Sequence, residues 1–283
     1  MPSTFVSGIS YSTIEIIDCV PAWEMQTGLS LYNHLRDILP NKSAPRITRC
    51  VVSSEEEFWQ ALDRIEADCQ VGWKPIIHIE GHAGKEGFEV GHRPDQAGCP
   101  LCWHALVDRL RAINIACDFN LGVFVAACEG TEALRPLTIK RPAPYMFLVG
   151  PKVEVNADIM KTAARNFYDV VVKKPDLNRA FNELPKQFTP FLAERFFATV
   201  YARVLKQQSF GQRRKERVNS LVKMALPGDA PPDQLHAVRG MAKVFSRPDV
   251  DRFEAAQRVF LPAGLSFTFD DLVEFARSGK LPE

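Results

Sequence analysis

Two short apolar runs constrain the fold of this chain most. Residues 75–81 have the sequence Pro-Ile-Ile-His-Ile-Glu-Gly and lead into His82, and residues 123–127, Val-Phe-Val-Ala-Ala, lead into Cys128. Runs of this length and composition are typical of strands buried on both faces of a parallel sheet. Open α/β sheets carry their sites at the carboxyl ends of such strands. If the two strands are neighbours, a thiol and an imidazole meet at one edge of the sheet.

The first 185 residues alternate strand and helix patterns throughout. Strand patterns cover 13–19, 47–52, 75–81, 123–127 and 145–149, and helical spacing covers 29–39, 55–68 and 103–113. This alternation predicts a mostly parallel α/β sheet flanked by helices, with right-handed crossovers. Ser53 or Ser54 is the expected N-cap of the second helix, because acidic residues follow at once. Residues 86–90 are expected to form a small hairpin arm.

The composition changes at about residue 185. Residues 188–205 are rich in Phe, Leu and Val and predict a long helix, and shorter helices follow the Pro-Pro pair at 231–232. We therefore expect an α/β domain over 1–185 and a helical C-terminal extension over 186–283. The aromatic stripe over 188–201 indicates core or an inter-domain seam, with a partner-binding face left open. The basic cluster at 213–217 is more typical of a solvated helix face than of a phosphate or nucleic-acid site.

Composition argues against several classes of protein. The formal net charge of +1 gives no general reason to expect nucleic acid or an anionic membrane as a partner. The first 25 residues contain no lysine or arginine and no long apolar stretch, which predicts the absence of a signal peptide. No run approaches the ~18 apolar residues that span a bilayer. Seven irregularly spaced cysteines favour a reducing, cytoplasmic compartment.

Cys128 and His82 have the chemistry of a nucleophile and its base. A thiol attacks carbonyls efficiently only as a thiolate, and a nearby histidine supplies that activation. His82 would then protonate the leaving amine. The backbone N–H groups of Gly81, Ala83 and Gly130, with that of Cys128, are the candidates for stabilising the oxyanion. A lone buried cysteine is usually a small hydrophobe, so the matching histidine decides the interpretation.

Two neighbouring residues compete for catalytic roles. His78 lies four residues before His82, so both point to one face of a strand, as does Glu80. We expect His78 to be buried and structural, because it lies in the middle of the strand. Glu129 follows Cys128 directly, and a solvated carboxylate is the expected reading there.

A second cluster contains metal-ligating residue types. Cys99 and Cys102 form one Cys-x2-Cys pair, with His92 and His104 nearby. Such a set suits zinc, but the histidine spacing matches no standard finger. We favour a loop that leads into a helix, and we expect neither a metal nor another cofactor.

The spacing of the two apolar runs resembles a known signature. Caspases carry Q-A-C-[RQG]-G with the histidine about 50 residues upstream, and this chain has Ala126-Ala127-Cys128-Glu129-Gly130 with His82 before it. Residues 81–84 are similar to the "GHG" box of metacaspases and CHAT domains with one inserted alanine, and residues 127–131 are similar to the CHAT "SACETG" box. Residues 147–150 fit the strand after the catalytic cysteine, and residues 166–168 and 177–181 fit the helices beyond it. The chain thus resembles the caspase-like cysteine peptidase superfamily over residues up to about 184.

This resemblance implies a cysteine endopeptidase that acts on a protein substrate and is controlled by a partner or ligand. Bacterial relatives are linked to defence and programmed cell death, some by cleaving a gasdermin-like pore former. Ala126 departs from the glutamine of caspases and the aspartate of metacaspases, so charge selection must come from the region before residue 29 or the loops after Cys128 and Gly150. Glu154 and Asp158 are the substrate-binding candidates. The alternatives are a catalytically silent scaffold that binds partners and a zinc-stabilised adaptor.

Overall fold

A computed structural model describes residues 8–39, 45–91, 99–226, 228 and 230–278. The chain divides into two compact units, one spanning Ser7–Ala193 and the other formed mainly by the residues from Glu194 onward. The first unit contains both sheets of the described chain, and the second is helical. The predicted fold class, a mostly parallel α/β sheet with flanking helices and C-terminal helices, is confirmed. The domain division at residue 185 stays a prediction.

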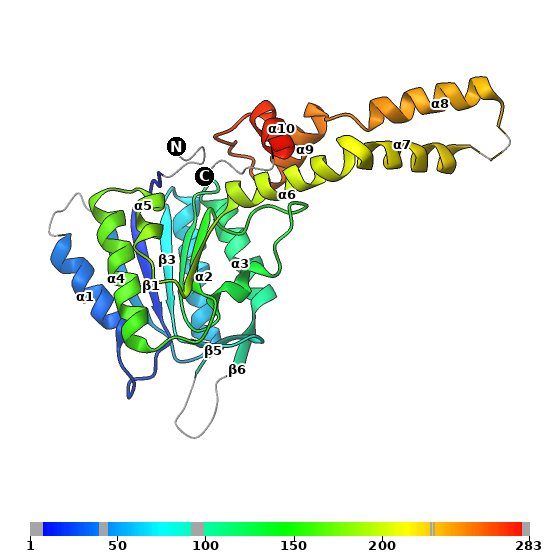
Figure 1. The fold of residues 1–283 in the computed structure, drawn as a ribbon. Coiled ribbons are helices and arrows are strands. Elements are labelled where there is room, and N and C mark those ends of the chain that lie inside the picture. Colours follow the sequence, from blue (N-terminus) through cyan, green and yellow to red (C-terminus); the bar gives the residue numbers. More distant parts are fainter. Residues whose placement is uncertain (1–7, 40–44, 92–98, 227, 229, 279–283) are drawn as a thin grey trace. The chain divides into compact units, whose positions relative to one another are not determined.

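Six strands form the central sheet in the order β2-β1-β3-β7-β8-β9 (Figure 1). They are β1 (Thr13–Asp18), β2 (Arg46–Val51), β3 (Pro75–Glu80), β7 (Gly122–Ala126), β8 (Phe147–Pro151) and β9 (Phe188–Leu192). The first five run parallel, and β9 pairs with β8 in the antiparallel direction. Every residue of β3 and β7 is buried, which explains why their sequences are apolar without alternation.

Helices cover the sheet and complete its core. They are α1 (Thr27–Ile38), α2 (Glu55–Gln70), α3 (Trp103–Ala116), α4 (Ala157–Lys173) and α5 (Leu177–Asn182), with a 3-10 turn η1 (Gly130–Leu134) after β7. The buried face of α4 packs with α1 against the sheet, around Phe124, Phe147 and Phe167. Ser54 caps α2, because its side chain accepts a hydrogen bond from the Glu57 N–H group. The predicted N-cap is thereby confirmed at Ser54.

A small antiparallel sheet follows β3. It consists of β4 (His82–Ala83), β5 (Gly87–Val90) and β6 (Cys99–Cys102), in that order. The hairpin expected over 86–90 is therefore part of a three-stranded sheet. The prediction of a loop around Cys99 is wrong, because residues 99–102 form a strand that pairs with β5 and buries Leu101.

The C-terminal unit contains α6 (Ala193–Gln208), α7 (Gly211–Ala225), α8 (Pro232–Phe245), α9 (Val250–Phe260) and α10 (Phe269–Ser278). Phe197 and Tyr201 of α6 stack on one another and pack against Phe253 and Phe260 of α9. No helix among the described residues combines the length and apolarity that a membrane crossing needs.

The helix expected from residue 188 is wrong over its first five residues. Phe188–Leu192 forms the edge strand β9, and the helix begins at Ala193. Pro190 explains the difference, because proline has no N–H donor and its ring clashes with the preceding turn of a helix. An edge strand tolerates proline, since one of its sides has no ladder to complete.

Candidate active site

The strands that precede His82 and Cys128 are direct neighbours in the sheet. Glu80, the last residue of β3, pairs with Ala126, the last residue of β7. His82 and Cys128 each follow two residues after this pair, at the carboxyl edge of the sheet. The Gly81 N–H group donates to the Ala126 carbonyl at 3.3 Å and extends the pairing past the strand ends. The two apolar runs are therefore neighbouring strands of one parallel sheet.

Cys128 lies at a sharp turn just after β7. Ala126 and Ala127 are buried, whereas Cys128 is half-buried, with its Sγ 3.6 Å from the Val155 carbonyl oxygen. Glu129 has a φ of 53°, in the left-handed region that non-glycine residues seldom adopt. The next N–H group, that of Gly130, donates back to the Ala127 carbonyl at 3.2 Å. This turn lifts the thiol out of the buried strand to the edge of the sheet.

His82 opens β4 and is held by a carboxylate. Its Nε2 lies 2.8 Å from Oε2 of Glu24, and its side chain is 43% exposed. Glu24 comes from the loop between β1 and α1, far from His82 in the sequence. Sequence reasoning missed Glu24, because nothing in its local pattern indicates that its loop lies over the end of β3.

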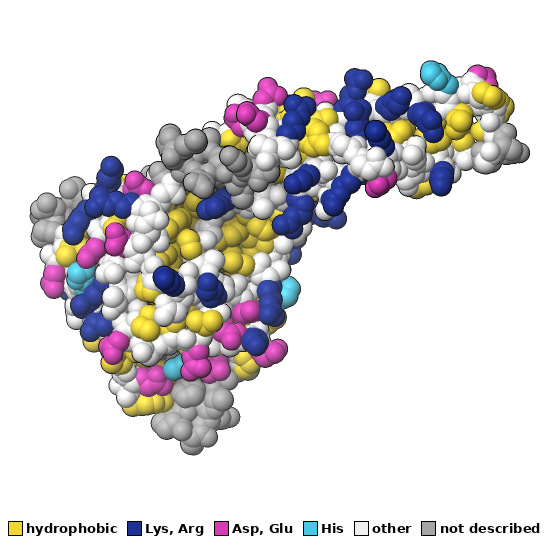
Figure 2. Space-filling view, in the orientation of Figure 1, with side chains coloured by type: hydrophobic (Ala, Val, Ile, Leu, Met, Phe, Trp, Pro, Cys, Tyr) yellow, Lys and Arg dark blue, Asp and Glu magenta, His cyan; other side chains and the backbone are white. Residues whose placement is uncertain are grey.

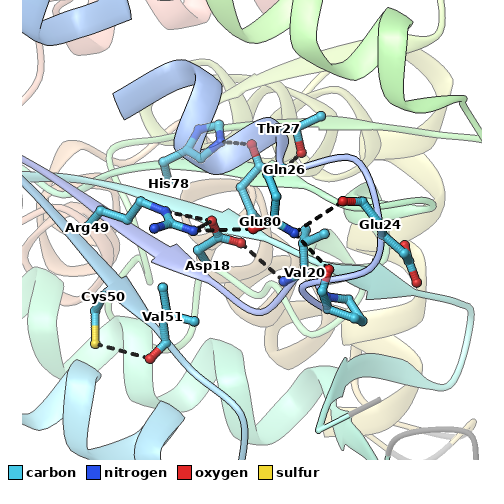
Figure 3. Close-up of polar contacts among 11 residues, drawn as sticks. Asp18, Val20, Glu24, Gln26, Thr27, Arg49, Cys50, Val51, His78 and Glu80 are labelled. Carbon is cyan, nitrogen blue, oxygen red and sulfur yellow. Dashed lines mark hydrogen bonds and ion pairs between the residues drawn. The ribbon is translucent and has the colours of Figure 1, made fainter. Parts of the chain in front are cut away.

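His78 belongs to a buried polar network beneath this edge (Figure 3). Its Nε2 lies 2.8 Å from Oε1 of Glu80, and its Nδ1 lies 3.3 Å from the Tyr168 hydroxyl. The other Glu80 oxygen accepts a hydrogen bond from the Thr27 hydroxyl at 2.6 Å. Both His78 and Glu80 are fully buried, so the burial expected for His78 is confirmed.

A second buried pair shapes the loop that carries Glu24. Asp18 ends β1 and is completely buried, with Arg49 of β2 contacting its Oδ2 through Nη2 at 2.7 Å and Nε at 2.8 Å (Figure 3). The other carboxylate oxygen of Asp18 accepts a hydrogen bond from the Val20 N–H group. Within the same loop, the Gln26 side chain donates a hydrogen bond to the Pro21 carbonyl at 2.7 Å. Asp18 therefore anchors the loop and offers no uncompensated charge to a substrate.

The N–H groups that are candidates for binding the oxyanion differ in whether they already donate a hydrogen bond within the chain. Those of Gly81 and Gly130 donate to carbonyls of this chain, as described above. Gly84 donates to the Gly87 carbonyl, which makes 84 and 87 a hydrogen-bonded pair in the β4–β5 ladder. Such pairs alternate in antiparallel ladders, so the next pair, Ala83 with Phe88, is of the other kind. The Ala83 N–H group therefore points away from β5.

The loop after β8 borders the turn at Cys128. The Val155 carbonyl contacts the thiol, and the Val153 carbonyl lies 3.5 Å from the Glu129 nitrogen. Glu154 lies between these two residues and is exposed. Asp158 is also exposed and lies in the first turn of α4, where a negative charge also stabilises the helix.

The described part of the second cluster does not form a metal site. Cys102 and His104 are both exposed, and His92 lies outside the described residues. Within the described residues, no three His, Cys, Asp or Glu side chains are grouped so as to hold a metal ion.

The chain matches no family model and no curated protein. Among solved structures, it is similar to a secreted C11 cysteine protease from Bacteroides thetaiotaomicron, determined in complex with an irreversible peptide inhibitor. The similarity covers 71% of this chain and 72% of that chain, with 9% sequence identity and a TM-score of 0.41.

Proposed function

We propose that this chain is a cysteine endopeptidase of the caspase-like kind, with Cys128 as nucleophile and His82 as acid and base. The observation that carries the proposal is the register of β3 and β7, which ends both strands at the pair Glu80 and Ala126. Two residues beyond that pair, one segment supplies a thiol and the other an imidazole. Nucleophilic catalysis by cysteine needs a thiol and an imidazole close together, and this register supports the proposal by bringing both segments to one edge of the sheet.

The reaction follows from these two groups. His82 takes the Cys128 proton, and the thiolate attacks the peptide carbonyl to form a C–S bond and an oxyanion. The Ala83 and Cys128 N–H groups are the donors that we assign to this oxyanion. As the C–N bond breaks, His82 returns the proton to the leaving amine. Water, deprotonated by His82, then hydrolyses the thioester and releases the acid and the free thiol.

Glu24 is assigned the role of positioning His82. Its contact with Nε2 at 2.8 Å orients the ring, and we assign the proton exchange with Cys128 to Nδ1. Glu24 does not touch the reacting atoms, and its loss should reduce turnover without abolishing it.

Substrate selection is assigned to the loop after β8. Ala126 is buried and apolar, and the Asp18 charge is compensated by Arg49. Glu154 and Asp158 are exposed carboxylates on the segment whose carbonyls border Cys128. We propose that one charged residue of this loop sets the selectivity; Glu154 and Asp158 are the first to mutate, and the exposed Lys152 on the same loop offers the opposite charge. Cleavage of a peptide library by Glu154→Gln and Asp158→Asn variants tests this, and a strong charge preference that survives both changes would place the pocket elsewhere.

A covalent probe tests the catalytic assignment. A peptidyl acyloxymethyl ketone should label the wild-type chain at Cys128, and Cys128→Ala should lose both labelling and peptide cleavage while remaining folded. Cys50→Ala and Cys102→Ala are matched controls, since both thiols are partly or fully exposed and lie outside the site. Cleavage by a folded Cys128→Ala protein refutes the proposal. Absence of labelling and cleavage in the wild type favours the catalytically silent scaffold.

Control by a partner or ligand and a link to bacterial defence also belong to the proposal. They rest on the resemblance of the segments around His82 and Cys128 to caspase-like peptidases. The test is whether cleavage by the pure protein rises when candidate activators are added.

A further inference from the structure

The positive charge of this chain is concentrated in one part of the C-terminal unit. Between Arg203 and Arg247 the sequence has ten lysines and arginines and three acidic residues, a net charge of +7 in a chain whose total is +1. Most of these residues lie on α7 and α8. Figure 2 shows lysine and arginine side chains gathered over these two helices, with hydrophobic side chains between them. The rest of the chain is correspondingly acidic.

A cavity of about 520 Å³ lies between α7 and α8. We call it the basic groove, and its lining includes Phe210, Arg214, Lys215, Val218, Arg239 and Lys243. Val218 is buried and Phe210 half-buried, so the floor is apolar, whereas Lys215, Arg239 and Lys243 are exposed. Arg214 donates from Nη2 to the Lys243 carbonyl, and its Nε is buried with no hydrogen-bond partner among the described residues. Within the described part of the chain, no ion pair neutralises these four cations.

The two helices also expose apolar side chains that a solvated hairpin does not need. Their shared core is small, formed by Val218, Val222 and Ala242 with Leu221 and Val238 packed against it. On α8, Met241 is 63% exposed and Phe245 is 48% exposed, and on α7 Met224 is 82% exposed. Met241 and Phe245 are four residues apart on α8 and therefore lie on the same face of that helix.

We propose that the basic groove binds an acidic segment of a partner protein, with apolar side chains on the groove floor and carboxylates against the four cations. An amphipathic segment of this kind satisfies the charges and covers the apolar floor together. A nucleic-acid backbone would satisfy the cations but would bring no apolar side chains to the groove floor at Phe210 and Val218. The site lies wholly within the C-terminal unit, and its test does not depend on Cys128.

Selection from a phage-displayed library of random peptides tests this proposal. The bait is the full chain carrying Cys128→Ala, which prevents cleavage. Counter-selection uses the same chain with Lys215→Glu and Arg239→Glu, one reversal on each helix of the groove. A matched control carries Arg195→Glu and Arg203→Glu, exposed positions on α6 outside the groove that change the net charge equally. Thermal melting by circular dichroism checks that all variants fold.

We expect enriched peptides to carry Asp or Glu around Leu, Phe or Met. Fluorescence anisotropy should show that the charge reversals in the groove lower the affinity for these peptides about tenfold or more. The charge reversals on α6 should lower this affinity by less than about threefold. Replacing the apolar residues of a peptide by serine should weaken it as well. Equal binding to both reversed variants, or no acidic enrichment, overturns the proposal. The proposal is also overturned if a single-stranded 20-mer DNA or phosphatidylserine vesicles bind more tightly than the selected peptides and the groove reversals abolish that binding. A dimer in sedimentation that the groove reversals dissociate overturns it as well.

Discussion

Replacing Gly81 by alanine should destabilise the N-terminal unit through one identifiable clash. A Cβ at this position would lie 2.7 Å from Cζ of Phe88 and 3.3 Å from Cβ of Cys19. Carbon atoms pack at about 3.5–4.0 Å, so the ring or the backbone must move by about 1 Å. Phe88 has no solvent-exposed surface, and its ring packs on that of Phe58 with the centroids 5.6 Å apart. The Phe88 ring therefore cannot move away from the new Cβ without disturbing its neighbours.

Overpacking of this kind costs about 1–3 kcal/mol. For a unit of this size, each kcal/mol lowers the melting temperature by about 2–4 °C. Phe88→Leu removes the ring atoms that clash, at a cost of about 1–2 kcal/mol in lost apolar burial. The double variant should therefore be less destabilised than the sum of the two single changes, by about 1–3 kcal/mol.

Tryptophan fluorescence during urea unfolding measures these differences. All four tryptophans, Trp23, Trp59, Trp73 and Trp103, lie in the N-terminal unit, so the signal reports that unit alone. Gly84→Ala is the matched control, because a Cβ there meets nothing within 4 Å. It should be neutral or stabilise the unit by about 0.4–1 kcal/mol. A Gly81→Ala variant as stable as Gly84→Ala, or a loss that Phe88→Leu does not relieve, refutes the reasoning.

Three further predictions follow from the same contacts. Arg49→Met should destabilise the N-terminal unit by about 3–5 kcal/mol in urea unfolding followed by tryptophan fluorescence, because it leaves the buried Asp18 carboxylate unpaired. Arg258→Met breaks an exposed pair with Glu254 and should cost the C-terminal unit under about 1 kcal/mol in urea unfolding followed by circular dichroism. Glu24→Gln should lower kcat of peptide cleavage more than Glu154→Gln does, with KM little changed; equal kcat values for Glu24→Gln and wild type would remove Glu24 from the mechanism. Burial raises the pKa of Tyr201 to about 12, above its ordinary value of about 10. Since the folded-state pKa is the higher one, this stabilisation is complete below pH ~10 and is lost as the pH rises towards about 12, so circular dichroism should show a shallower alkaline loss of helix stability for Tyr201→Phe.

Local patterns in the sequence predicted most of the elements and the two residues that we propose as nucleophile and base. The apolar runs before His82 and Cys128 predict buried parallel strands, and these strands are β3 and β7. Burial on both faces removes alternation from a strand, and that effect is visible without knowing its neighbours. The burial of His78 was predictable for the same reason. The N-cap at Ser54 was predictable because a cap is set by residues that are close in the sequence. The helix predicted from residue 188 failed because the aromatic pattern outweighed Pro190, a local signal that was present.

Only the tertiary structure decided which distant residues meet. The sheet order places β3 between β1 and β7, and so brings the loop after β1, with Glu24, over the start of β4 and His82. The same order pairs Asp18 with Arg49 across β1 and β2. The basic groove likewise needs α7 and α8 side by side, although the charges of each helix are plain in the sequence. Such contacts depend on which elements pack together, and packing is chosen by the burial of whole faces, which no single stretch of sequence contains.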